Sequence, residues 1–349
     1  MSCALAPETS QSAEELEMKE TKPSPRWRLA ILAIALASTA SLRARAAEGS
    51  FERTLAVTGP VELDVSTGSG HINVRAGDSS NVHVNGTIKA SQSWHLDEAE
   101  MGRKVRYLES NPPIEQHGNF IRIGHIEDRE LSHNISISYD LVVPAGTRLR
   151  SQTGSGSQSV EGIQGPVKAL TGSGSVKVEN IGDEVRAETG SGDVQVDSVK
   201  GATHASTGSG SIRASGLGSS FVASTGSGSI KLEQTGPGDG KVETGSGSIE
   251  LQNVRGALRV RTGSGNITAQ GAPTGEWSLH TGSGRILVRL PPGAAFELNA
   301  HTSSGHISTS ADHPVTVQGT IGRGELRGKV RGGGPLLELE TGSGNIQIE

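Results

Sequence analysis

Residues 171–206 read TGSGSVKVENIGDEVRAE followed by TGSGDVQVDSVKGATHAS, two units of equal length that align without a gap. The tetrapeptide TGSG that opens each unit recurs along the chain. It begins at Thr67, Thr153, Thr171, Thr189, Thr207, Thr225, Thr244, Thr262, Thr281 and Thr341, and a variant, TSSG, begins at Thr302. From Thr153 to Thr302 the residue number of this Thr advances by 18, 18, 18, 18, 19, 18, 19 and 21. Self-similarity at a fixed period is the signature of a repeat architecture.

Each unit has a second, shorter period of apolar residues. Counted from Thr171 as position 1, positions 6 and 8 are Val176 and Val178, with polar residues beside them. Position 11 is apolar again, and a Gly flanks it, which indicates a corner. Positions 15 and 17, here Val185 and Ala187, continue the alternation toward the next Thr. A period of two predicts half-buried strands, so each unit contains two of them.

One such unit cannot bury its apolar face alone, whereas units stacked at ~4.8 Å bury a continuous narrow core. The sequence therefore predicts an all-β fold, a single-chain parallel β-solenoid or β-helix. The repeat period sets coils of about 18 residues, and about 11 coils occupy the regular part of the chain, 151–349. The interval from Thr302 to Thr341 equals two steps, with Thr320 in TIGRG as an expected degenerate copy.

The residues of TGSG have a structural interpretation. Gly permits positive φ and close backbone approach at a corner. Thr is β-branched, suits a strand end, and is expected to form a hydroxyl ladder with the Thr above and below. Phosphate-binding loops require a following Lys-Ser/Thr at a helix N-terminus. Because a strand follows TGSG here, phosphate binding is not indicated.

The composition agrees with such a core. The chain has 349 residues, of which 49 are Gly and only 9 are aromatic (4 Phe, 3 Trp and 2 Tyr). The net charge of −5 creates no field that favours nucleic acid, so no nucleic-acid partner is expected. The single Cys, Cys3, precludes an intramolecular disulfide.

Residues 1–46 are predicted to be an N-terminal extension and a signal peptide. The run 29–42, LAILAIALASTASL, is uncharged and follows Arg26 and Arg28. It is too short for a confident membrane span but suits a signal core. Cleavage is expected after Ala46 or Ala47, and Met18 is an alternative start. The expected location is the periplasm or the cell surface. The alternative is an uncleaved anchor at 29–42, the only expected membrane contact.

Residues 47–150 are predicted to form N-terminal β-coils interrupted by a helix at about 93–110. Trp94, Met101, Val105 and Leu108 share one helical stripe, and Pro112 and Pro113 follow its end. Strands are expected at 119–126 and 134–144. The helix is expected to cap the solenoid, because a bare end exposes unpaired strand edges and core.

The segment 137–162, ISYDLVVPAGTRLRSQTGSGSQSVEG, resembles the bacterial putative-adhesin family of exported β-strand-repeat proteins. Tyr139, Leu141, Val143, Pro144 and Gly146 match its Tyr-x-Leu-x-Val-Pro-x-Gly segment, which leads into units such as TGSGSVKV at 171–178. The resemblance covers about residues 55–349. It implies a β-repeat fold preceded by a short helix, and hardly constrains activity.

No catalytic, cofactor-binding or metal-ligating residues are predicted. His301, His306 and His313 match no zinc spacing and are expected at the surface, and Asp193 is isolated among its equivalents, which disfavours calcium. Outer charges alternate in sign, which favours cross-strand pairing over a catalytic cleft. Trp277 and Phe296 are expected to meet in consecutive coils, in the core rather than on a binding surface.

The sequence thus predicts an exported, non-enzymatic protein that acts as a cell-envelope scaffold or adhesin-like surface. No cofactor is expected, and the partner would be an unidentified surface ligand, a glycan or an envelope or matrix protein. A β-helix enzyme acting on polysaccharide and an accessory module in envelope stress sensing remain as alternatives.

Overall fold

The computed structural model describes residues 47–77, 80–91, 98–317 and 324–349. The predicted signal segment, Trp94 and Thr320 lie outside these ranges. Within them the chain is all-β, with two helices, α2 (Glu98–Ser110) and α3 (Arg129–Ser132). Among these residues no helix is long and apolar enough to span a membrane.

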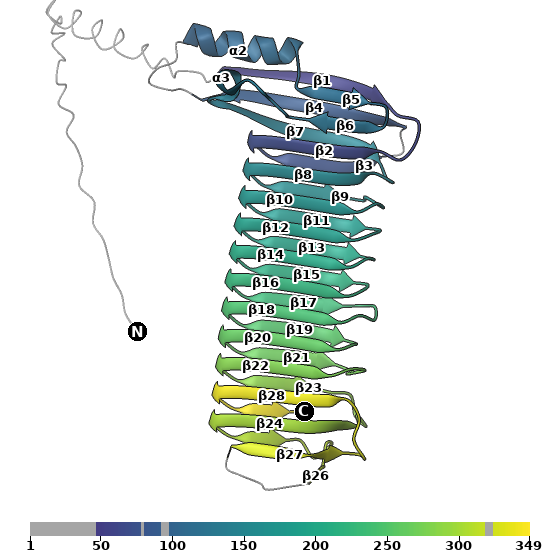
Figure 1. Ribbon diagram of the computed structural model, residues 1–349, viewed down its shortest axis with the longest axis vertical. Coiled ribbons are helices and arrows are strands. Elements are labelled where there is room, and N and C mark those ends of the chain that lie inside the picture. Colours follow the sequence, from purple (N-terminus) through teal and green to yellow (C-terminus); the bar gives the residue numbers. More distant parts are fainter. Residues whose placement is uncertain (1–46, 78–79, 92–97, 318–323) are drawn as a thin grey trace, which may run out of the picture. The chain divides into compact units, whose positions relative to one another are not determined.

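The strands form two long sheets (Figure 1). In spatial order, sheet A consists of β1 (Glu48–Ala56), β4 (Asn81–Ala90), β7 (Ile135–Pro144), β3 (Ile72–Gly77), β9 (Gln158–Glu161), β11 (Val176–Ile181), β13 (Val194–Val199), β15 (Ile212–Leu217), β17 (Ile230–Gln234), β19 (Ile249–Val254), β21 (Ile267–Gly271), β23 (Ile286–Arg289), β29 (Ile346–Ile348) and β25 (Ile307–Thr309). Sheet B consists of β26 (Val315–Val317), β27 (Glu325–Val330), β24 (Phe296–Ser304), β28 (Leu336–Ser343), β22 (Trp277–Ser283), β20 (Leu258–Ser264), β18 (Gly240–Ser246), β16 (Phe221–Ser227), β14 (Thr203–Ser209), β12 (Val185–Ser191), β10 (Val167–Ser173), β8 (Arg148–Ser155), β2 (Glu62–Ser69), β6 (Phe120–Ile123) and β5 (Ile114–His117).

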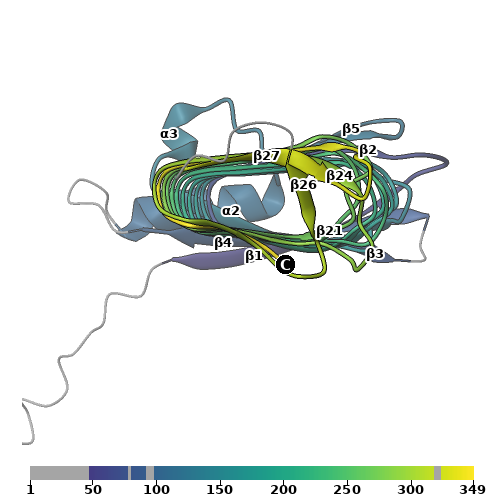
Figure 2. The same ribbon diagram turned by 90° about the horizontal axis from the view of Figure 1, so that it is seen from below.

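The chain alternates between the two sheets, and strands of neighbouring coils pair in parallel. We call a sheet B strand, its TGSG corner and the following sheet A strand one coil. In sheet B, Val167 lies opposite Val185 and Thr171 opposite Thr189. Seen end-on, the coils superimpose as flattened loops with two long sides (Figure 2). These long parallel sheets are consistent with the predicted solenoid.

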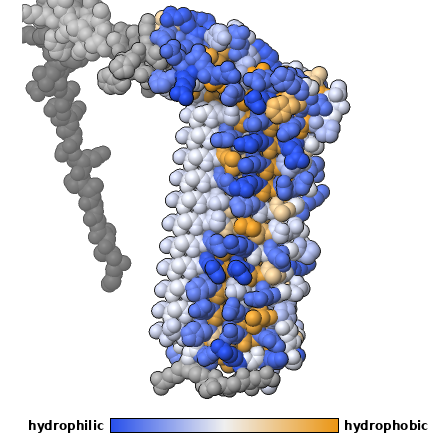
Figure 3. All heavy atoms as spheres, in the orientation of Figure 1, coloured by the Kyte–Doolittle hydropathy of each residue, from blue (hydrophilic) through white to orange (hydrophobic). Residues whose placement is uncertain are grey.

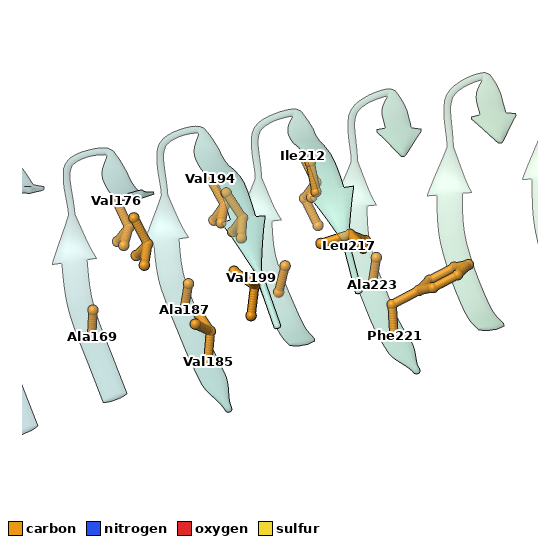
Figure 4. Packing of buried hydrophobic residues seen from close by; sticks show 14 of the residues in the cluster. Ala169, Val176, Val185, Ala187, Val194, Val199, Ile212, Leu217, Phe221 and Ala223 are labelled. Carbon is orange, nitrogen blue, oxygen red and sulfur yellow. The ribbon is translucent and has the colours of Figure 1, made fainter. Parts of the chain in front are cut away.

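The core is a narrow layer of small and branched side chains between the two sheets. Val176 and Val194 enter it from sheet A, and Val185, Ala187 and Phe221 enter it from sheet B (Figure 4). The predicted apolar positions are thus buried. Parallel β-stacking repeats the same side chain at nearly the same depth in each coil, which is why the layer admits few rings.

Phe221 and Trp277 are two buried rings of the core, and each has a local adaptation. Phe221 is buried opposite Gly240, where a Cβ would lie 2.4 Å from the Phe221 Cζ atom. Trp277 is fully buried and donates its indole N–H to the carbonyl of Gly256 at 2.9 Å. Phe296 is also buried, so the core assignment of Trp277 and Phe296 is right. Their predicted contact in consecutive coils is wrong, because the strand of Leu337 lies between theirs.

At the N-terminal end the chain leaves the stack and returns. After β2 and β3 it runs through β4, α2, the β5–β6 hairpin, α3 and β7 before β8 resumes the coils. Strand β4 pairs antiparallel with both β1 and β7, so this part is not a simple series of coils. The helix buries Met101, Val105 and Leu108, three of the four predicted stripe residues, against β1 and β4.

At the opposite end the order of the coils in space differs from their order in sequence. The coil formed by β28 and β29 lies between the coil of β22 and β23 and the coil of β24 and β25 (Figure 1). Thr341 therefore lies opposite both Thr281 and Thr302. Strand β27 pairs antiparallel with the outer edge of β24. The expectation that the last copies follow one another as two further steps is wrong.

Candidate functional site

The TGSG corners form one long edge of the stack, and the Thr of each corner ties its coil to the next. The Thr189 hydroxyl donates to the carbonyl of Gly174, and the Thr207 hydroxyl to that of Gly192, both at 2.8 Å. The same bond recurs at Thr153, Thr171, Thr225, Thr244, Thr262, Thr281, Thr302 and Thr341. The predicted Thr–Thr hydroxyl ladder is therefore replaced by a ladder from Thr to Gly.

In the regular coils both glycines of the corner lie close to the backbone of the preceding corner. A Cβ on Gly172 would lie 2.6 Å from the carbonyl oxygen of Gly154. A Cβ on Gly174 would lie 2.2 Å from that of Gly156, and Gly174 also has a φ of +143°. No other residue fits at either position without a backbone shift.

The serines of the corners are exposed and in register. Ser173, for example, lies opposite Ser155 and Ser191. In the space-filling view the corners form a continuous pale band along the side where the arrows of β8 to β28 end (Figure 3). The TGSG residues of this edge are uncharged, and backbone groups of successive corners bond to one another, for example the Gly174 N–H to the Ser191 carbonyl.

The outer face of sheet A carries ion pairs on neighbouring side chains. Lys177 binds Glu179 of its own strand at 2.8 Å, and Lys231 binds Glu250 of the next coil at 3.0 Å. The hydrogen bond that Lys177 donates to Glu179 raises the pKa of Lys177, and the bond that Lys231 donates to Glu250 lowers the pKa of Glu250. These contacts include the predicted cross-strand pairing and also pairing within a strand.

The outer face of sheet B contains a groove of about 550 Å³ that crosses the strands from β2 to β16. We call it the sheet B groove. Its basic side chains are Arg148, Arg150, Lys168, Arg186 and His204, and its acidic ones are Glu62, Asp64 and Glu184. Pro166 and Val222 also line it, and Val222 is one of the few exposed large apolar residues of the described chain.

Four of these five basic side chains, all but Arg148, come from one repeat position. Register pairs Arg150 with Lys168, Lys168 with Arg186, and Arg186 with His204. They occupy position 16 of the unit, so aligning the repeats could have found this row. The sequence reasoning missed it because it compared charges only on the strand that follows TGSG.

The histidines do not converge on a site. His301 and His306 are exposed as expected, but His313 is buried and packs edge-on against Phe296 at 5.9 Å between ring centroids. The surface prediction for His313 is therefore wrong. Within the described residues, no group of three His, Cys, Asp or Glu side chains could hold a metal ion.

A second feature is a smaller cavity of about 240 Å³ where the N-terminal excursion meets the first coil. Tyr139, Thr67 and His125 are among its lining residues. Among the described residues the buried Tyr139 hydroxyl has no hydrogen-bond partner, and burial raises its pKa. His125 and Ser132 line the same cavity, and the Thr67 hydroxyl donates to the carbonyls of Ile137 and Ser69.

A comparison with protein-family models identifies the architecture. The model of the Toastrack DUF4097 family matches residues 60–349, most of the chain. The chain belongs to this family. The match includes every TGSG unit and the Tyr139 to Gly146 segment, in agreement with the family resemblance of the sequence. No curated protein matches the chain.

Solved structures of similar proteins have low sequence identity to this family member. A putative cell adhesion protein from Clostridium sporogenes has 12% identity and a TM-score of 0.23, over 86% of this chain and 98% of its own. A putative adhesin from Bacteroides fragilis has 10% identity and a TM-score of 0.26, over 86% and 97%. One from Parabacteroides distasonis has 11% and 0.29, also over 86% and 97%.

Proposed function

We propose that this protein is an exported, non-enzymatic β-solenoid that acts as an adhesin-like binding surface or scaffold of the cell envelope. In this proposal residues 1–46 direct export or anchor the chain, and the protein resides in the periplasm or on the cell surface. Residues 47–150 form the N-terminal coils with α2 as their cap. Residues 151–349 form the regular solenoid, in which the repeat period sets the length of a coil at about 18 residues.

The observation that carries the proposal is the register of sheet B. It places equivalent outward side chains of successive coils side by side, for example Lys168 beside Arg150 and Arg186. The sheet B groove runs across these rows. A ligand with its own repeat can contact several equivalent groups at once, so that weak single contacts add up to useful affinity.

If the protein were instead a polysaccharide-cleaving enzyme, the same groove would need catalytic carboxyl groups. Glycoside hydrolysis uses two carboxyl groups that face each other across the scissile bond. Glu62, Asp64 and Glu184 line the groove, but the row of side chains that crosses its strands is basic. This balance favours binding over hydrolysis, and a turnover assay decides between them.

Two measurements test the proposal. First, the full chain is expressed in a bacterial host, and the cells are fractionated and treated with protease from outside. We expect a species beginning near Ala47 outside the cytoplasm, or an intact chain anchored at 29–42 and accessible to protease. Retention of the protein in the cytoplasm would contradict the proposal.

Second, the purified full chain is screened against glycans and envelope or matrix proteins, and each hit is incubated and analysed for cleavage. Saturable binding without turnover is the expected result. Cleavage of a bound glycan would instead establish the enzyme alternative. Binding to none of the ligands would remove the adhesin-like role.

A further inference from the structure

We propose that the sheet B groove binds a linear acidic polysaccharide, whose carboxylate or sulfate groups pair with Arg148, Arg150 and Lys168 and continue toward Arg186 and His204. This inference rests on the proposed binding function and names its ligand class. It goes beyond that function by assigning the site, the contacting residues and the charge of the ligand.

The row of basic side chains is unfavourable for the protein without a ligand. Arg150, Lys168 and Arg186 lie directly opposite one another on three adjacent strands, at a strand spacing of ~4.8 Å. Like charges placed opposite each other destabilise a sheet. Departures from local rules of this kind are expected at functional sites.

In the coils of β12 and β18 the basic residue at this position forms an ion pair, whereas, within the described residues, Arg150 and Lys168 at the start of the row do not. Arg186 binds Glu188 at 2.5 Å, and Lys241 binds Glu243 at 3.2 Å, each two residues along the same strand. In β8 and β10 the corresponding residues are Gln152 and Leu170.

Opposing acids do not neutralise these cations either. Within the described residues, Arg148, Arg150 and Lys168 consequently form no ion pair. Glu62 and Asp64 on β2 lie opposite Arg148 and Arg150, yet no ion pair joins them. They close the basic row at its N-terminal side.

The geometry of the row selects the ligand. Guanidinium groups bind planar or tetrahedral oxyanions through paired N–H donors, which suits carboxylates and sulfates. Arg150, Lys168 and Arg186, repeated once per coil over three strands, suit a linear polymer whose negative charges also repeat. Pro166 and Val222 beside the row supply apolar contact for the faces of sugar rings.

Single-stranded nucleic acid fits the groove less well. Its binding proteins stack the bases on exposed aromatic side chains. Of the two aromatic residues along the groove, Phe221 is buried in the core, and the Arg122 guanidinium already covers Phe120 at 5.5 Å.

The test uses the full chain with polygalacturonate and heparin as carboxylated and sulfated probes, and dextran as a neutral one. The groove variant carries Arg148→Gln, Arg150→Gln and Lys168→Gln. A matched control carries Arg103→Gln, Lys200→Gln and Arg213→Gln, which remove the same charge from other surfaces. Comparable thermal midpoints show that both variants are folded.

We expect salt-sensitive binding of at least one acidic probe and none of dextran. The groove variant should lose at least about tenfold in affinity, since each charged hydrogen bond contributes more than a kcal/mol, whereas the control should stay within about twofold. A second variant, Gln152→Glu with Leu170→Glu, keeps the cations but gives them the intrastrand partners seen at Glu188 and Glu243. It should weaken binding by a similar factor.

Equal affinities of the groove and control variants would overturn the assignment, as would equal binding of dextran. Tighter binding of single-stranded DNA than of either acidic glycan would replace the polysaccharide with nucleic acid. If the chain binds another envelope ligand but no acidic glycan, this inference fails while the proposed function stands. If it binds acidic glycans through the groove but is not exported, the proposed function fails instead.

Discussion

The Thr189 hydroxyl donates to the carbonyl of Gly174 in the preceding coil at 2.8 Å, from a buried position at the end of a sheet B strand. Substituting Thr189→Val keeps the branched shape but removes the donor. We expect a loss of about 1 kcal/mol in the free energy of unfolding, measured by denaturant titration. Thr268→Val, at an outward position of β21, is the control and should leave the midpoint nearly unchanged. Equal effects of the two substitutions would contradict a structural role for the Thr to Gly bond.

Gly68 and Gly172 are both the first Gly of a TGSG corner, but they differ in the space around them. Gly172→Ala places a Cβ 2.6 Å from the Gly154 carbonyl, whereas Gly68→Ala places it where no atom lies within 4 Å. We expect Gly172→Ala to cost about 1–3 kcal/mol of stability through overpacking. Gly68→Ala should fall within about 0.5 kcal/mol of the parent protein. Thermal and denaturant unfolding of both variants, side by side, measure the difference.

The Phe221 ring occupies the space beside Gly240 of the next coil, where a larger residue would have its side chain. Phe221→Ala alone should cost about 3–5 kcal/mol through the cavity it leaves. Gly240→Ala alone should cost about 1–3 kcal/mol, because its Cβ meets the Phe221 ring. In the double variant the added methyl group enters vacated space, so the combined loss should be smaller than the sum. Strict additivity in this double-mutant cycle would show that the two sites are independent.

The Lys231–Glu250 contact predicts a pH dependence. Because the hydrogen bond from Lys231 lowers the pKa of Glu250, the pair stabilises the folded state above the ordinary carboxyl pKa. That contribution is lost as the pH falls through the lowered pKa. For this exposed pair we expect about 0.2–1 kcal/mol at neutral pH.

Substitution Lys231→Met should therefore lower stability at neutral pH but not in acid, and should raise the Glu250 pKa in an NMR titration. Lys200→Met is the control. A stability difference that persists unchanged at low pH would assign the effect to packing rather than to charge.

Removing one whole coil tests whether coils stack independently. Deletion of 189–206 joins Glu188 to Thr207 and keeps every side chain on its own face. We expect a folded, shorter protein with the same circular dichroism spectrum per residue. Deletion of 189–205 shifts the strand by one residue and moves its core side chains to the solvent face. This second protein should be unfolded or aggregated; identical behaviour of the two deletions would show that register is not decisive.

The sequence predicts the depth of side chains well and their partners less well. Val176, Val178, Val185 and Ala187 are buried as expected, because alternation in a strand determines which face a residue occupies. The partner of Thr189 could not be predicted in this way. The carbonyl of Gly174 is placed by a corner with positive φ, a geometry that the residue pattern permits but does not specify.

Equivalence of the repeats also limits what the sequence predicts at the ends. Thr302 and Thr341 belong to copies that both fit beside the copy of Thr281, so the pattern indicates that they stack but not in which order. The groove is the opposite case. An alignment of the repeats shows its row of basic residues at position 16. The structure adds that an acid two residues further along the strand pairs with such a residue, and that Gln152 and Leu170 stand at that place in β8 and β10.

The displaced coil of β28 and β29 has a consequence for how this end of the protein is built. During synthesis β24 and β25 are made before β28 and β29. In the folded protein, however, β28 lies between β22 and β24, and β29 lies between β23 and β25. Assembly here cannot proceed by laying each new coil on the last. The coil of β24 and β25 can therefore reach its final pairing only after β28 and β29 have been synthesised.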